Sequence, residues 1–185
     1  MRRWSAVSFV LLLALSTAAI AEDSNTVRKQ ILADFNRAMV SLKRHDIKGF
    51  LAFVADDYAG NSQGMKVNKA YVEQTMKPHL DGTNTIHAYS YDIENLKVSG
   101  ARATGKATFT LDSTVLDSQG MMGAKGSTHR MTYAQTFDTT WTRTGNHWQR
   151  SRETSIGQPR ITVDGKPFNP MAPPAAPAKP AKPAK

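Results

Sequence analysis

Residues 46–58 read Asp-Ile-Lys-Gly-Phe-Leu-Ala-Phe-Val-Ala-Asp-Asp-Tyr, a helix-capping residue followed by apolar side chains at helical spacing. Asp46 can cap a helix, because its carboxylate accepts hydrogen bonds from the backbone N–H groups that have no partner in the first turn. The stretch therefore predicts a short helix over residues 47–54. Its apolar face would consist of Ile47, Phe50, Leu51 and Val54.

A longer amphipathic helix is predicted before this stretch. Apolar side chains recur there every three or four residues, which is the spacing of one helical face. Ser24 or Asn25 can cap the start of this helix. Its apolar face would consist of Val27, Ile31, Phe35, Met39 and Leu42, widened by Leu32 and Ala38.

The residues after Tyr58 predict a turn and a third helix. Residues 61–64 read Asn-Ser-Gln-Gly, which is typical of a turn or a short edge strand. Asn68 can cap a helix that runs through Met76. Pro78 would end that helix, because proline lacks the N–H group that the helical hydrogen-bond pattern needs.

From Thr85 onward the sequence changes to a strand pattern. Threonine is frequent, and its β-branched side chain suits a pleated sheet better than a helix. Helices followed by antiparallel strands indicate an α+β domain, whose long strands must twist and curl around the first helix. The predicted strands cover residues 85–98, 101–116, 127–143 and 147–157, with tight turns at 99–100 and 145–146 and a longer glycine-containing connection at 120–126.

Three short motifs, in this order and spacing, resemble the nuclear transport factor 2-like (SnoaL-like) domain family. The first is the stretch 46–58. The second is residues 100–104, Gly-Ala-Arg-Ala-Thr, which is similar to the family's turn followed by a strand of small residues. The third is residues 141–148, Trp-Thr-Arg-Thr-Gly-Asn-His-Trp, which is similar to the family's final hairpin. The resemblance covers about residues 24–157.

The resemblance implies a cone-shaped fold, in which a curved antiparallel sheet wraps N-terminal helices and leaves a pocket at its wide end. Members of the family include ketosteroid isomerases, polyketide cyclases, dehydratases, epoxide hydrolases and non-catalytic binding or assembly modules. The fold alone therefore does not settle the function.

The ketosteroid isomerases of this family need a carboxylate base and an acidic hydrogen-bond donor. An ungapped comparison with the family places Ser62 at the position of the base and Ala38 at the position of the donor tyrosine. Serine cannot act as such a base, and alanine has no proton to donate. We therefore expect no isomerase activity of this kind.

Two arginines of the last strand are the strongest candidates for polar ligand contacts. In a strand without a bulge, Arg150 and Arg152 lie on one face with Trp148, and Glu153 lies on the opposite face. If the arginine face lines the pocket, the two charges need a partner, because an isolated buried charge is costly. An anionic ligand could bind both by forked hydrogen bonds. The alternative is that both arginines face solvent, or pair with Glu153 or Asp138.

Tyr89, Tyr91 and His129 complete the candidate pocket, although aromatic residues in strands commonly serve packing alone. A dyad of His129 with Asp138 would need both side chains on one face, and an unbulged strand places them on opposite faces. We assign no catalytic residue, no metal site and no cofactor, since the scattered histidines and the pair His129 and Met131 form no specific metal motif. One face of this strand would carry His129, Met131, Tyr133, Gln135 and Phe137.

Residues 1–21 resemble a bacterial secretory signal peptide. Two arginines precede a short apolar run, and Ala-Ile-Ala at residues 19–21 fits a signal peptidase site. The apolar run is shorter than a membrane span needs, so we expect cleavage before Glu22 rather than stable membrane insertion. The protein is thus expected to be periplasmic or secreted, with residues 22–170 as its single domain.

Residues 171–185 form a Pro/Ala/Lys-rich tail in which Pro-Ala-Lys occurs three times, a composition that predicts disorder. The whole chain has 24 Lys+Arg and 15 Asp+Glu, a net charge of +9. Removing the two arginines of residues 1–21 and the three lysines of the tail leaves +4 on the domain. This modest charge, with no nucleic-acid motif, indicates no nucleic-acid partner. The absence of cysteine excludes disulfides and Cys-ligated zinc.

The sequence thus predicts an exported protein with a cone-shaped pocket that binds a small organic or anionic ligand, or a protein partner, without catalysis. Two alternatives stay open. One is a SnoaL-like cyclase, dehydratase or hydrolase acting on a small organic substrate, which convergent titratable groups in the pocket would favour. The other is an assembly module that forms a homodimer through the sheet, which an apolar outer face would favour.

Overall fold

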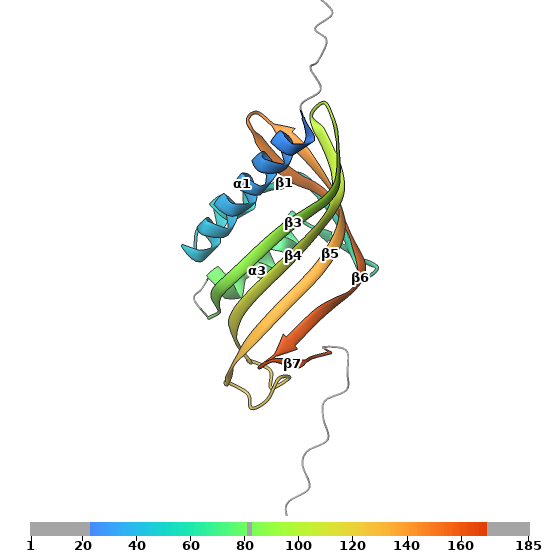
Figure 1. The fold of residues 1–185 in the computed structure, drawn as a ribbon. Helices are drawn as coiled ribbons and strands as arrows, with labels where there is room; N and C mark the ends of the chain where they lie inside the picture. The colour runs from blue at the N-terminus through green and yellow to red at the C-terminus, as the bar shows by residue number, and fades with distance from the viewer. Residues whose placement is uncertain (1–22, 81–82, 170–185) are drawn as a thin grey trace, which may run out of the picture.

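The computed structural model describes residues 23–80 and 83–169, so the predicted signal peptide and the predicted tail lie outside the described residues. Helices come first and long strands follow, as predicted (Figure 1). The elements are α1 (Ser24–Lys43), α2 (Ile47–Leu51), β1 (Val54–Ser62), β2 (Met65–Asn68), α3 (Lys69–Leu80), β3 (Thr85–Ser99), β4 (Arg102–Leu116), β5 (Thr128–Thr144), β6 (His147–Val163) and β7 (Lys166–Pro167).

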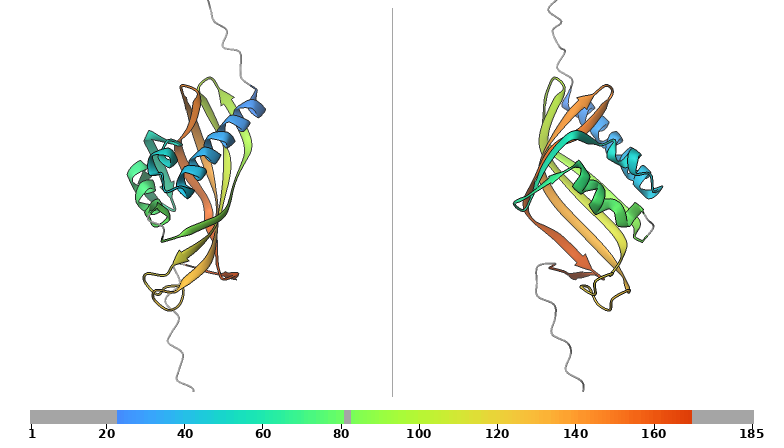
Figure 2. Two further views of the ribbon diagram at one scale, coloured as in Figure 1. Left: turned by 90° about the vertical axis from the view of Figure 1, so that its left-hand side faces the viewer. Right: turned by 180° about the vertical axis from the view of Figure 1, so that it is seen from behind.

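The strands form one curved sheet in the order β2-β1-β6-β5-β4-β3, and β7 pairs with β6. Strands β3 to β6 are an antiparallel meander, but β1 runs parallel to β6. The four predicted strands are antiparallel as expected, and the sheet as a whole is mixed because β1, which was not predicted as a strand, joins it in parallel. The helices lie on the concave face of the sheet (Figure 2). No helix within the described ranges is long and apolar enough to cross a membrane.

The helix starts follow the capping rules, with one shift. Asp23 caps α1 by accepting a hydrogen bond from Thr26 N at 3.3 Å, so neither predicted residue is the cap. Asp46 caps α2 as predicted, accepting from Gly49 N at 3.0 Å. Asn68 accepts from Tyr71 N at 2.9 Å at the start of α3, also as predicted.

The helix ends differ more from the prediction. Helix α2 stops at Leu51, because Val54 already pairs with β6 as the first residue of β1. Helix α3 continues past Pro78 to Leu80. A proline removes one backbone hydrogen bond from a helix, because it has no N–H group, and here the missing bond lies in the last turn.

The predicted apolar face of α1 is the centre of the core. Phe35 stacks on Tyr91 of β3 with ring centroids 4.5 Å apart, and it meets Phe53 edge-on. Burial of each such side chain stabilises the fold by about 1.5–3 kcal/mol. The first helix thus fills the concave face. Its buried apolar residues are Val27, Ile31, Phe35, Ala38, Met39 and Leu42.

Two bulges change which side chains of β6 face inward. Trp141 pairs with Arg150, whereas Thr140 pairs with Arg152, so Ser151 is an extra residue in β6. Further along, Thr136 pairs with Ile156 and Ala134 with Arg160, so residues 157–159 form a larger bulge. Gly157 has φ 65° there, a left-handed conformation that glycine adopts freely. Because the strand resumes after this bulge, β6 ends at Val163 rather than near residue 157.

Candidate functional site

A cavity of about 390 Å³ lies between the concave face of the sheet and the helices. This volume is typical of a site for a small organic molecule. The wall is mostly apolar and aromatic, and it draws on α1, α3, β4 and β5. Representative lining residues are Phe35, Met39, Val72, Phe109, Leu111 and Phe137.

Several polar side chains interrupt this apolar wall, and Arg150 and Glu153 come together among them in one group. Arg150 Nη1 donates a hydrogen bond to Glu153 Oε2 at 2.8 Å, and Tyr58 OH donates to the same oxygen at 2.7 Å. The side chains of Arg150 and Glu153 are only 17% and 5% exposed. The guanidinium carbon of Arg150 lies 5.4 Å from the ring centre of Phe53 and 5.8 Å from that of Tyr58. The three residues thus form a charged, hydrogen-bonded group inside the cavity, which we call the polar trio.

The polar trio is not saturated with hydrogen bonds. Glu153 Oε1 and Arg150 Nε are buried without a hydrogen-bond partner among the described residues, and so is the nearby hydroxyl of Tyr91. A buried polar atom without a partner costs about 1–3 kcal/mol. A ligand that donates to Glu153 would remove part of this cost and so gain affinity.

Burial and charge fix the protonation of these groups. Burial first, and then the negative charge of Glu153, raise the pKa values of Tyr58 and Tyr91 beyond their usual range. The same two causes raise the pKa of Tyr133 to about 12. Burial is the largest single effect on Arg150 and opposes its charge, but Glu153, Tyr58 and Tyr91 together outweigh it and raise the pKa of Arg150. At neutral pH the tyrosines are therefore neutral donors and Arg150 is a cation.

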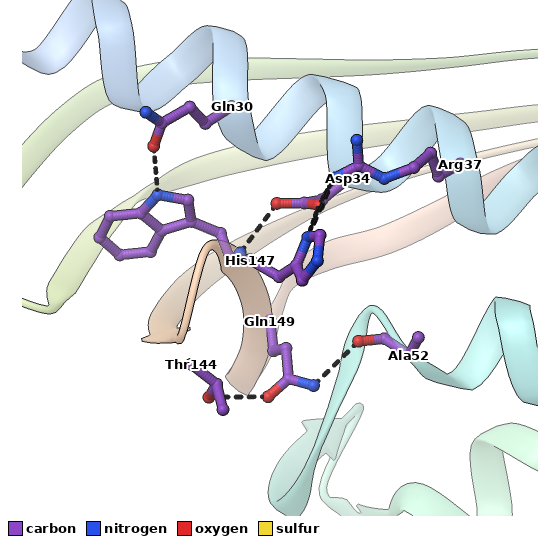
Figure 3. Close-up of polar contacts among 8 residues, drawn as sticks. Gln30, Asp34, Arg37, Ala52, Thr144, His147 and Gln149 are labelled. Atoms are coloured by element: carbon purple, nitrogen blue, oxygen red, sulfur yellow. Dashed lines mark hydrogen bonds and ion pairs between the residues drawn. The ribbon is translucent and has the colours of Figure 1, made fainter.

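A second polar cluster holds the strand that carries the polar trio (Figure 3). Asp34 of α1 is buried, and its carboxylate accepts from Trp148 N at 2.8 Å, from His147 Nδ1 at 3.0 Å and from Arg37. Trp148 Nε1 donates to Gln30 at 2.9 Å. These bonds pin the start of β6 to α1, two residues before Arg150.

The bulge at Ser151 overturns the prediction about strand faces. Arg150 does line the cavity, but Arg152 lies on the convex face of the sheet and is exposed. Glu153, which we expected on the opposite face, lies on the same face as Arg150 and pairs with it. The expectation that the arginines share a face and lack a carboxylate was therefore wrong, because simple alternation does not survive an extra residue.

The other predicted residues have different surroundings. Tyr91 lines the cavity, whereas Tyr89 packs edge-on against Phe35 at 5.8 Å and is not among the lining residues. Trp148 is fully buried in the core beside α1. His129 lies at the far end of β5, away from the polar trio. Its partner carboxylate is Asp164 at 2.7 Å, and Asp138 is exposed elsewhere on the strand.

The predicted face of β5 is confirmed in part: Met131, Tyr133 and Phe137 line the cavity. The sequence did not mark Tyr58 as a cavity residue, and it placed Glu153 on the wrong face, although pairing of the arginines with Glu153 was the stated alternative. Tyr58 ends the stretch 46–58, but no pattern in that stretch marked it as an inward-facing strand residue. No group of three or more His, Asp or Glu side chains in the described part of the chain is arranged to hold a metal ion.

No family model and no curated protein matches this sequence. Solved structures do match. A conserved protein from Planctomyces limnophilus has a TM-score of 0.55 at 13% identity, covering 75% of this chain and 98% of that one. A candidate scytalone dehydratase from Novosphingobium aromaticivorans has a TM-score of 0.54 at 14% identity, covering 86% and 99%. A Mycobacterium tuberculosis protein of unknown function has a TM-score of 0.51 at 14% identity, covering 71% of each chain.

The chain has the nuclear transport factor 2-like fold. This confirms the α+β architecture that the three sequence motifs predicted, with helices inside a curled sheet. At such low identity the likeness establishes the nuclear transport factor 2-like fold alone. Activity has to be argued from the cavity and its polar trio.

Proposed function

We propose that this protein binds a neutral, mostly apolar organic molecule in the cavity, and that it does so after export. The observation that carries the proposal is the polar trio inside an apolar wall. Arg150 and Glu153 compensate each other's charge, so the cavity has no net charge that would select an anion. An anionic ligand would be favoured by two uncompensated arginines, but Glu153 compensates Arg150 and Arg152 lies outside the cavity.

The unpartnered atoms define the ligand further. Glu153 Oε1 can accept a hydrogen bond, so a ligand hydroxyl or N–H group would find a buried, charged acceptor there. The aromatic wall around Phe35, Phe109 and Phe137 suits a flat ring system. A fused aromatic ring with one hydroxyl, such as 2-naphthol, has these properties.

A fluorescent probe tests binding in the cavity. N-phenyl-1-naphthylamine is neutral and apolar and carries one N–H donor. We expect its fluorescence to rise on binding and to fall when 2-naphthol displaces it. Val72→Trp would fill the cavity from α3 and should abolish the signal, while Gln74→Trp gives a matched change at an exposed position of the same helix that does not line the cavity. Equal binding by the wild type and by folded Val72→Trp would place the probe elsewhere and refute the proposal.

A second candidate function is an enzyme that acts on a similar molecule. The observation in its favour is the convergence of Glu153, Arg150 and three tyrosines in one desolvated site. We favour binding, because Arg150 compensates the charge of Glu153 and the tyrosines stay protonated at neutral pH. Isomerisation of a β,γ-unsaturated ketosteroid is the sharpest test, since Ser62 and Ala38 replace the two groups that reaction needs. We expect no turnover.

An assembly role is the weaker alternative. The convex face is rich in threonine and carries the charged residues Lys106, Arg130 and Arg152, and such a surface does not favour a large apolar interface. Export is tested separately: protein recovered from the periplasm or medium of a bacterial host should begin at Glu22. An intact Met1 in the membrane fraction would contradict the proposal of cleavage and release.

A further inference from the structure

A Ser–His–Asp chain of hydrogen bonds lies at the far end of the sheet, outside the polar trio. Ser127 is the last residue before β5, His129 is the second residue of β5, and Asp164 begins the turn between β6 and β7. This turn and the loop between β4 and β5 lie side by side at one end of the molecule (Figures 1 and 2). His129 shares the concave face of β5 with Met131 and so points inward from that end.

These three hydrogen-bonded residues have the arrangement in which a histidine can act as a general base toward a serine hydroxyl. Ser127 Oγ lies 2.7 Å from His129 Nε2, and His129 Nδ1 lies 2.7 Å from Asp164 Oδ2. A proton on Nδ1 shared with a carboxylate leaves the lone pair of a neutral imidazole on Nε2, which faces the serine. The single proton of the Ser127 hydroxyl is donated to Ala124 O at 2.6 Å, so the hydroxyl must turn from this acceptor to His129 Nε2 before the imidazole can take the proton.

Backbone hydrogen bonds and a tight turn hold Asp164 beside His129. Asp164 Oδ1 accepts from Arg130 N at 3.0 Å, and Asp164 N donates to Arg130 O at 2.8 Å. The hydrogen bond from His129 first, and then that from Arg130 N, hold the pKa of Asp164 below its usual value, so it is ionised at neutral pH. Asp164 has φ 50° and precedes Gly165 at φ 77°, the backbone of a tight hairpin turn.

The loop that presents Ser127 is ordered around Asp117. Backbone N–H groups from five consecutive residues donate to this buried carboxylate, at 2.6–3.3 Å. Asp117 N donates to Ser127 O at 2.8 Å, which ties the end of the loop to its start. Gly123 packs against the imidazole: a Cβ at this position would lie 3.1 Å from His129 Cε1. The five residues are Gln119, Gly120, Met121, Met122 and Gly123.

We propose that Ser127 is a nucleophile, activated by His129 and accepting acyl groups from small activated carboxylic esters. Ser127 Oγ attacks the carbonyl carbon and forms a C–O bond, while its proton moves to His129 Nε2. The bond to the leaving alcohol breaks, and the same proton passes to the leaving oxygen. Water then attacks the acyl group by the same route, releasing the carboxylic acid and restoring the serine. Asp164 is a positioning residue, since it acts through the imidazole.

The solvent exposure of His129 and Asp164 determines how fast we expect Ser127 to react. The side chain of His129 is 13% exposed, but that of Asp164 is 56% exposed, so water screens its effect on the imidazole. The reaction should therefore be slow, and covalent capture is a better measure than turnover. This proposal does not depend on a ligand in the cavity, so each can fail without the other.

A fluorophosphonate ester tests the proposal, because it phosphonylates activated serines and the adduct can be located by peptide mass spectrometry. The full chain should be modified at Ser127, and unfolding in urea should abolish the reaction. His129→Asn should slow it by about a hundredfold, the usual contribution of a general base. Ser118→Ala alters an exposed serine of the same loop outside the chain of hydrogen bonds and should leave the rate unchanged.

Asp164→Asn is the second variant, in case His129→Asn loses its fold as judged by circular dichroism. It should slow the modification by roughly tenfold or more, since the imidazole loses its orienting carboxylate. The proposal is overturned if Ser127 is not modified in the folded protein. It is equally overturned if a folded His129→Asn or Asp164→Asn variant reacts at the wild-type rate.

Discussion

Asp34 and Glu153 are both buried carboxylates, but their hydrogen bonds differ. Both oxygens of Asp34 have donors, from a backbone N–H, an imidazole and a guanidinium. Glu153 receives two bonds on Oε2 and none on Oε1. A saturated buried acid serves the fold, because nothing is left to offer a ligand. An unsaturated one beside a cavity keeps an acceptor for a partner that the chain itself does not supply.

The largest effect is expected at the saturated carboxylate. Asp34→Ala would leave Trp148 N buried without an acceptor and would free the β5–β6 hairpin from α1. We expect the free energy of unfolding to fall by about 3 kcal/mol, from the orphaned N–H group and the lost charge-assisted hydrogen bonds, and the melting temperature by roughly 10 °C. Urea denaturation measures the first quantity. Asp138→Ala, at an exposed position, is the control, and a similar small change in both variants would contradict the structural role of Asp34.

A smaller loss of stability, with a loss of binding, is expected at the unsaturated carboxylate. Glu153→Gln keeps the shape and the acceptor for Tyr58 but leaves Arg150 without a counter-charge. We expect a loss of about 2 kcal/mol in urea denaturation. Replacing both partners, Arg150→Met with Glu153→Leu, should restore stability to within about 1 kcal/mol of the wild type, because no buried charge remains. A double variant less stable than Glu153→Gln would show that the ion pair itself stabilises the fold.

Asp117 extends the comparison to pH. Burial opposes its ionisation, but the backbone hydrogen bonds, led by those of Met122 and Met121, hold its pKa below the usual value. A lowered pKa stabilises the folded state above the unfolded-state value of about 3.9, and this stabilisation disappears as the pH falls through the folded-state pKa. The difference in melting temperature between the wild type and Asp117→Asn should therefore be largest at neutral pH. It should decrease as the pH is lowered. A difference that does not vary with pH would contradict this role of the loop.

The smallest effect is expected on the convex face. Arg152 is exposed and lies on the opposite side of the sheet from the polar trio. Arg152→Ala should change the free energy of unfolding by no more than about 0.5 kcal/mol and should leave probe binding unchanged. Weaker binding by this variant would mean that ligands also use the outer surface.

The sequence predicted the parts of the fold that depend on local periodicity. The apolar face of α1 and the caps at Asp46 and Asn68 follow from helical spacing and side-chain chemistry, which the environment changes little. Strand β1 was missed, because Asp56 and Asp57 are unusual in strands. Its start pairs with β6, almost a hundred residues away, and only its end pairs with the nearby β2.

The candidate site was predicted only in part. Arg150 and Tyr91 were named correctly as residues that line the cavity, but the bulge at Ser151 leaves no trace in the alternation of polar residues around it. That one extra residue brings Glu153 inside and Arg152 outside. The turn at Asp164-Gly165 did carry a recognisable signal, since Asp-Gly is typical of tight hairpins. It could have placed a carboxylate near the start of β5, where His129 lies.

Competition between 2-naphthol and 2-naphthoate tests most directly whether the cavity prefers a neutral hydrogen-bond donor to an anion. The two molecules share a ring system and differ in charge. At pH 7, competition with N-phenyl-1-naphthylamine should give 2-naphthol a dissociation constant at least about tenfold lower than that of 2-naphthoate. This is a difference of about 1.4 kcal/mol in binding free energy. 2-Naphthol should bind more weakly to the Arg150→Met, Glu153→Leu double variant, because its hydroxyl loses the acceptor Glu153 Oε1. Tighter binding of 2-naphthoate by the wild type would contradict a preference for neutral ligands, since Arg150 would then be free to bind anions despite Glu153.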